Sequence, residues 1–83
     1  MVRRIGFVGV LLESRDGVDV VNRVLSEHAE LILARVGLPR RERGVSVITL
    51  VVEATTDELG SLTGKLGAIG GVSVKSALSK QGK

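Results

Sequence analysis

Two stretches of the chain are apolar at both odd and even positions. From Val45 to Val52 both sets of alternate residues are mostly Val, Ile or Leu, and the run from Arg3 to Glu13 follows the same pattern. Alternate residues of a strand point to opposite faces, and a strand that is apolar on both sides is typically covered on both. We therefore predict two central strands of a sheet. Gly6 and Gly9 interrupt the first of them and indicate that another backbone comes close.

The segment from Val18 to Ala29 has the period of a helix. Its apolar residues fill one half of the helical wheel and its polar residues the other half, as in an amphipathic surface helix. Ser14 and Asp16 are both candidate N-caps. His28 lies within the apolar half, and we predict that it is buried and bonded to a nearby carbonyl, because no cluster of further metal ligands accompanies it.

A second helix is predicted from Thr55 to about Leu66. Thr55 and Glu58 have the spacing of a capping box, and glycines beyond Leu66 end the helix. Three glycines lie on one side of this helix: Gly60, Gly64 and Gly67. Such a smooth strip allows another backbone to approach, either the first helix or a second subunit. The alternative is a loosely built helix of low intrinsic stability.

Two further strands complete the pattern. One runs from Leu31 to Leu38 and is expected to end at Pro39, and the other runs from Val72 to Leu78 with the alternation of an edge strand. The order β-α-β-β-α-β predicts an α+β fold of the ferredoxin-like kind, a four-stranded antiparallel sheet with two helices on one face. Its usual strand order puts the first and third strands in the middle. We expect residues 1–83 to form a single domain.

The sheet face without helices is predicted to be apolar. In either register the two central strands present several large aliphatic side chains there, and contiguous exposed apolar surface usually marks an interaction site. We therefore predict a homo-oligomer, a dimer or a tetramer, that assembles through the open sheet face.

Composition narrows the function classes. The chain has no Cys and one His, so we expect no metal, no cofactor and no enzyme activity. The run that follows the N-terminal arginines resembles a signal peptide only superficially, because it is only about eight residues long, contains two glycines and lacks a small-residue cleavage site. No segment approaches the length of a membrane span. These features predict a cytoplasmic protein.

The basic residues are concentrated in one place. Arg35, Arg40, Arg41 and Arg43 lie in or beside the turn between the second and third strands, although the net charge is only +3. Arginine side chains bind phosphate and carboxylate well, but Glu42 partly neutralises the turn and a solvated tip is the simpler interpretation. The one aromatic residue, Phe7, lies inside an apolar strand, so nucleic-acid binding is not favoured.

Particular motifs resemble a known family. They are G-x-P-x-R-E-x-G from Gly37 to Gly44, LTGKLG from Leu62 to Gly67 and GVSVK from Gly71 to Lys75. With the opening RRIGFVGVLLESR they are similar to the iron-only hydrogenase system regulators. This resemblance implies a ferredoxin-like domain related to ACT domains and to the C-terminal domain of the nickel-responsive regulator. The sequence departs from that regulator in lacking its DNA-binding segment and its His and Cys ligands, so nickel sensing is not expected.

Two function hypotheses follow. The first is an oligomeric ACT-like regulatory module that binds a small effector or a partner protein. Its candidate contacts are the strand-to-helix turn with Ser14, Asp16 and Gly17 and the strip of Gly60, Gly64 and Gly67. The alternative is a nucleic-acid-binding protein that uses Arg40, Arg41 and Arg43, repeated by symmetry.

Overall fold

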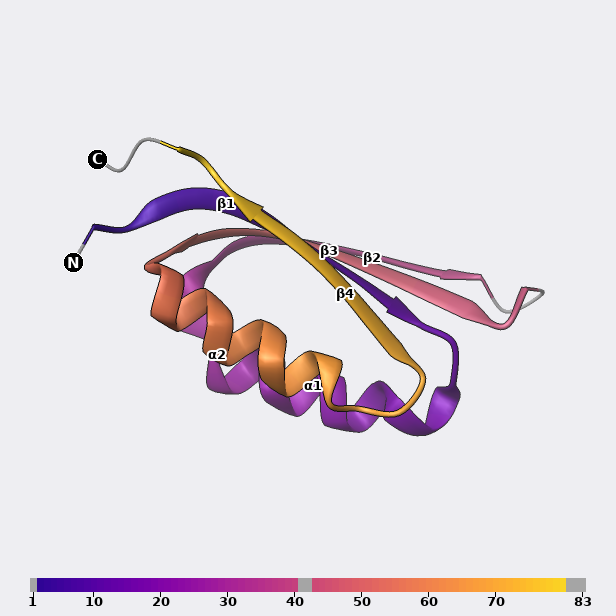
Figure 1. Cartoon of the computed structure of the whole chain (residues 1–83). Helices are drawn as coiled ribbons and strands as arrows, with labels where there is room; N and C mark the ends of the chain where they lie inside the picture. Colours follow the sequence, from indigo (N-terminus) through magenta and orange to yellow (C-terminus); the bar gives the residue numbers. More distant parts are fainter. Residues whose placement is uncertain (1, 41–42, 81–83) are drawn as a thin grey trace.

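The chain folds into a four-stranded antiparallel sheet with two helices against one face (Figure 1). The structure is a computed structural model that describes residues 2–40 and 43–80. The elements are β1 (Arg4–Leu12), α1 (Val18–Glu27), β2 (Ile32–Arg40), β3 (Val45–Ala54), α2 (Thr56–Gly67) and β4 (Val72–Leu78), with short 3-10 turns η1 (Arg15–Gly17) and η2 (Ala29–Leu31). The sheet order is β2-β3-β1-β4. The predicted fold is confirmed, and both strands predicted to be central lie in the middle.

The core lies between the sheet and the helices. The two central strands contribute seven buried side chains: Val8, Val10, Leu12, Ile48, Leu50, Val52 and Ala54. The helices contribute Val21, Val24, Leu25, Leu59, Leu62 and Leu66. Burying one such side chain is worth about 1.5–3 kcal/mol, so this one layer supplies most of the driving force for folding.

Hydrogen bonds mark the ends of both helices. Thr55 Oγ1 accepts from the Glu58 backbone N–H at 3.1 Å and the Glu58 carboxylate accepts from the Thr55 N–H at 2.9 Å, which confirms the capping box. The first helix ends at Glu27, two residues earlier than predicted, because the chain tightens into η2. His28 is buried there, with Nδ1 2.9 Å from the Val24 carbonyl oxygen, as predicted.

Strand β2 differs from the prediction at Pro39. The strand continues to Arg40, and Pro39 is paired with Ser46 of β3. The expectation that Pro39 ends the strand was therefore wrong. An edge strand tolerates proline because half of its backbone N–H groups face away from the neighbouring strand. The pairing also shifts by one residue between Ile32 and Ala34, which is a bulge of the kind common at sheet edges.

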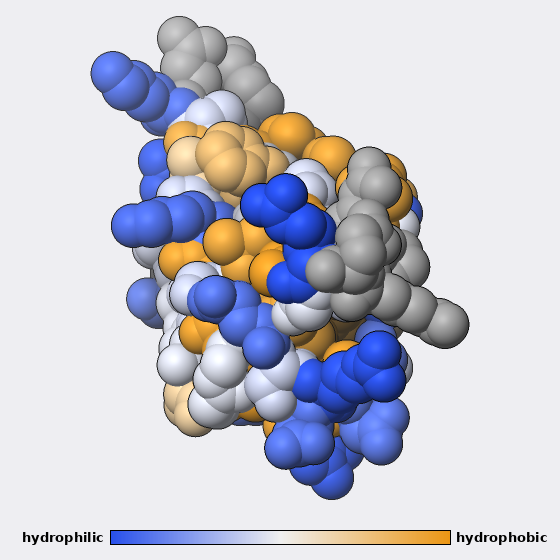
Figure 2. Space-filling view, turned by 90° about the vertical axis from the view of Figure 1, so that its right-hand side faces the viewer, coloured by the Kyte–Doolittle hydropathy of each residue, from blue (hydrophilic) through white to orange (hydrophobic). Residues whose placement is uncertain are grey.

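The face of the sheet without helices is apolar, as predicted. Phe7 is 50% exposed in the middle of β1, and the register places Val51 of β3 and Ala77 of β4 on its two sides. The other exposed apolar residues of this face include Ile5, Leu11, Val36 and Leu38. Figure 2 looks at the end of the molecule that carries the β2–β3 turn, and hydrophobic atoms reach the surface between charged side chains on its upper side, where the sheet lies. We call this surface the open face.

Candidate functional site

The turn from β1 to α1 lies against the loop from α2 to β4 and is hydrogen-bonded to it. The Glu13 backbone N–H donates to the Gly71 carbonyl oxygen at 2.7 Å, and Ser14 Oγ accepts from the Asp16 N–H at 3.2 Å. This proximity follows from the sheet, because Leu12 at the end of β1 pairs with Val72 at the start of β4. We call the turn and the loop together the corner.

A shallow hollow opens between the two segments of the corner. Its volume is about 420 Å³, and it is lined by Ser14, Asp16, Gly17, Val20, Ile69, Gly70 and Gly71. That volume falls in the range of small-molecule sites. Gly17 is buried, and a Cβ on it would lie 3.2 Å from Ile69 Cγ2, so its missing side chain lets the loop come close. Three of the predicted site residues, Ser14, Asp16 and Gly17, are thus brought together.

The polar groups of this hollow are few. The Asp16 carboxylate has no hydrogen-bond or ion-pair partner among the described residues, since only its backbone N–H is bonded. Asp16 is exposed, whereas Ser14 is half-buried. Chemically, the hollow offers one carboxylate, one hydroxyl and glycine backbone beside the apolar side chains of Val20 and Ile69. Such a set can receive a small molecule that carries a cationic or hydrogen-bond-donating group.

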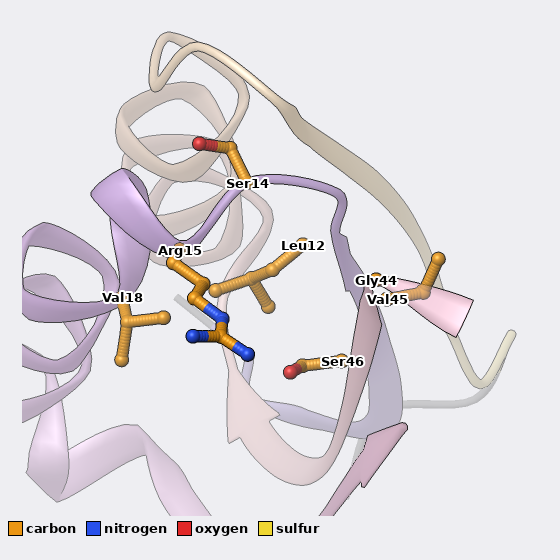
Figure 3. Close-up of a pocket in the computed structure, with 7 residues that line it drawn as sticks. All are labelled: Leu12, Ser14, Arg15, Val18, Gly44, Val45 and Ser46. Carbon is orange, nitrogen blue, oxygen red and sulfur yellow. The ribbon is translucent and has the colours of Figure 1, made fainter. Parts of the chain in front are cut away.

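Arg15 occupies a second, smaller hollow on the other side of the turn. The space left there is about 50 Å³, and its lining comes from Leu12, Ser14, Arg15, Val18, Gly44, Val45 and Ser46. Figure 3 shows the Arg15 guanidinium directed into this space between Val18 and Ser46, while the Ser14 hydroxyl turns away from it. A space of this size has room for only a few water molecules.

The glycine strip of α2 lies elsewhere. Gly60, Gly64 and Gly67 are exposed, and a Cβ on any of them would meet nothing within 4 Å. The strip therefore does not pack against α1, so that alternative was wrong. A second subunit or a loosely built helix remains as the interpretation of this strip.

The arginines do not form one cluster in the described residues. Arg35 is paired with Leu50, whose side chain is buried on the helix side of the sheet, and its guanidinium donates to Asn22 Oδ1 of α1 at 2.7 Å. Arg43 is exposed. Arg41 and the side chain of Arg40 lie outside the described residues. The engagement of Arg35 with α1 removes one member from the basic turn that a nucleic-acid interface would use.

Residues 2–40 and 43–80 show no group of three or more His, Cys, Asp or Glu side chains that could hold a metal ion. In the same residues no helix has both the length and the apolar character needed to cross a membrane.

Sequence reasoning missed part of the corner. No pattern in the sequence singles out Arg15, Ile69 or Gly70 as part of a site, and Gly71 stands out there only as the first residue of the GVSVK motif. The strand order contained the signal, because antiparallel neighbours β1 and β4 place the end of one beside the start of the other.

The family follows from comparison with known proteins. A family model described as "TM1266-like: Iron-only hydrogenase system regulator, putative" matches residues 4–76. The chain belongs to this TM1266-like family. The resemblance deduced from the motifs is thereby confirmed. No curated protein matches the chain.

Solved structures support the same assignment. The uncharacterised protein TM1266 from Thermotoga maritima is 39% identical with a TM-score of 0.90, over 94% of this chain and 99% of that one. The ACT domain from GTP pyrophosphokinase of Chlorobium tepidum is 22% identical with a TM-score of 0.77, over 90% of this chain and 99% of that one. A formyltetrahydrofolate deformylase from Pseudomonas putida KT2440 is 19% identical with a TM-score of 0.66, over 93% of this chain and 29% of that one. The last two matches show the fold alone, which is that of ACT domains.

Proposed function

We propose that this TM1266-like chain is a non-catalytic cytoplasmic regulatory module that binds a small effector at the corner and assembles through its open face. The regulated process is the one that the family description gives, the iron-only hydrogenase system. The observation that carries the proposal is the hollow of about 420 Å³ that joins Ser14 and Asp16 to the α2–β4 loop. The likeness to an ACT domain of a GTP pyrophosphokinase supports it.

The chemistry of the hollow defines the effector class. Asp16 supplies a negative charge without a partner in the described residues, and Val20 and Ile69 supply apolar surface. We infer a small metabolite with an ammonium or similar donor group and a short apolar part, such as an amino acid.

A thermal-shift screen with amino acids, nucleotides and divalent metal ions tests effector binding. A ligand present at 100 times its Kd stabilises the folded state by about 2.7 kcal/mol, which is easily seen as a rise in Tm. We expect Asp16→Asn to abolish the rise, whereas Asp19→Asn, at an exposed position of α1 outside the hollow, leaves it unchanged. No shift with any compound, or an equal shift in both variants, contradicts the proposed effector site.

The mass of the protein in solution tests assembly separately. Light scattering after gel filtration, over a range of concentrations, should give a dimer or a tetramer. A monomer at micromolar concentration contradicts assembly through the open face, whatever the ligand screen shows.

A further inference from the structure

A hollow opens on the open face over Gly9 of β1 and extends toward Leu11. Its volume is about 210 Å³, and it is lined by Gly9, Val10, Leu11, Val47, Ser73 and Lys75. An apolar cavity of about 150 Å³ in another protein holds a benzene molecule, so this space accepts a phenyl ring. The hollow exists because Gly9 lacks a side chain in the middle of a central strand.

The chain carries one side chain that fits the hollow. Phe7 is the only aromatic residue, and it stands 50% exposed two positions from Gly9 on the same face. An exposed aromatic ring beside an apolar hollow is a self-complementary surface. Self-complementarity is what a two-fold symmetric interface requires, since residue i contacts residue j in both directions.

We propose that two copies stack their open faces so that Phe7 of each copy enters the hollow above the partner's Gly9. This inference rests on the proposed assembly through the open face and adds the contact that fixes its register. The two β1 strands run in opposite directions, with the two-fold axis passing over Val8.

The remaining pairs agree with this register. With the axis over Val8, Ile5 faces the partner's Leu11, so the two ends of the β1 contact are also apolar. Val8 pairs with Leu50 of β3 and with Ser76 of β4, so the same axis passes over these two residues. The axis therefore also sets which residues of β3 and of β4 face each other across the interface. Lys75 faces the partner's Ala77, and Glu53 faces the partner's Val47. No two like charges meet among these pairs.

The area of the open face is sufficient. Four strands about 4.8 Å apart, taken over the 9 residues of β1 at about 3.3 Å each, cover roughly 550 Å² per copy. Two copies together bury more than about 1,000 Å², the lower bound for a specific interface. A second copy is therefore an adequate occupant for this face.

The test exchanges the ring and the hollow. Gly9→Phe fills the hollow, and the fold accepts it because a Cβ at this position would meet only the Lys75 carbonyl oxygen, at 3.8 Å. Phe7→Ala removes the ring. In the double variant, position 9 carries the phenyl ring and position 7 carries a small side chain that leaves room for it. Positions 7 and 9 still face each other across the axis, so each ring again has a space in the partner copy. We expect each single variant to raise the dissociation constant by roughly 100-fold, because two equivalent contacts are lost, and the double variant to recover much of the loss.

Circular dichroism controls for folding, and Gly64→Ala on the exposed face of α2 is the matched control for assembly. The proposal is overturned if Gly9→Phe leaves the dissociation constant unchanged, if the double variant is no better than the singles, or if Gly64→Ala has the larger effect. If the wild type still forms a dimer or a tetramer in those cases, only the Phe7 contact is refuted, and the proposed assembly through the open face stands. A monomeric wild type overturns both this contact and the proposed assembly.

Discussion

Gly71 lies directly against Ser14, at the point where the α2–β4 loop meets the β1–α1 turn. A Cβ on Gly71 would stand 2.9 Å from the Ser14 Cβ, and the backbone of Gly71 has φ of +79°. This position therefore excludes side chains both by contact and by backbone conformation. The contact sets how closely the two halves of the candidate effector site approach each other.

We expect Gly71→Ala to destabilise the protein by about 1–3 kcal/mol, because alanine is strained at positive φ and pushes the two segments apart. Urea unfolding followed by circular dichroism measures the loss. Gly70→Ala is the matched control, since a Cβ there meets nothing within 4 Å. Equal losses in the two variants would show that the loop adjusts without cost.

A second prediction concerns Gly6, where β1 and β4 come closest. A Cβ on Gly6 would overlap the Ala77 carbonyl oxygen and lie 2.7 Å from Leu78 Cδ2. We expect Gly6→Ala to cost about 2–3 kcal/mol through displacement of β4. Gly9→Ala, in the same strand, should cost little, because its Cβ has only one ordinary contact. Hydrogen exchange of β4 amides should be faster in the first variant only; unchanged protection would refute the prediction.

The start of α2 should make stability depend on acid pH. The Thr55 backbone N–H that donates to Glu58 lowers the pKa of this carboxyl below its ordinary value of 4.5, and Arg3, 3.0 Å away, lowers it further. A carboxyl whose pKa is lowered by folding contributes stability above its unfolded pKa, and this contribution is lost as the pH falls through the folded pKa.

Replacement of Glu58 by Gln should therefore reduce stability at neutral pH and flatten the decline of stability as the pH falls below the ordinary carboxyl pKa of 4.5. Unfolding free energies of both proteins, from neutral pH to below this value, provide the comparison. Asp57→Asn is the control, since Asp57 is an exposed acid of the same turn that takes no part in the capping box. Parallel curves for wild type and Glu58→Gln would show that the capping carboxylate does not contribute.

Truncation of the core should be costly at Leu62. This side chain of α2 is fully buried, so Leu62→Ala should lose about 2–5 kcal/mol through the lost burial and the cavity left behind. Val36→Ala, at a residue 66% exposed on the open face, should lose far less in the dissociated protein. Unfolding midpoints in urea at low protein concentration decide between these outcomes, and similar losses would place Leu62 outside the core.

Local patterns in the sequence were sufficient to predict most of the fold. The doubly apolar runs identified β1 and β3 as central strands, and the spacing of Thr55 and Glu58 located the start of α2. These features depend on neighbours in sequence, and so does the bond from His28 to the Val24 carbonyl.

The differences arise where distant segments meet. Pro39 remains in β2 because the strand lies at an edge of the sheet, and Arg35 is drawn from the basic turn by Asn22 of α1. The hollow at Asp16 depends on Ile69 and Gly70, more than fifty residues away, which only the pairing of β1 with β4 brings near. Sequence spacing alone cannot report such contacts, whereas the strand order can.

Strand β1 is shared by the two proposed sites. Its last residue, Leu12, leads into the corner, and its middle carries Phe7 and Gly9 on the open face. A ligand that moves the corner along the strand axis would thereby shift Phe7 and the hollow at Gly9 relative to the partner copy. Linkage then requires reciprocity: the factor by which an effector changes the affinity between copies is the factor by which association changes the affinity for the effector. The two proposals together therefore predict that the response to an effector depends on the concentration of the protein itself.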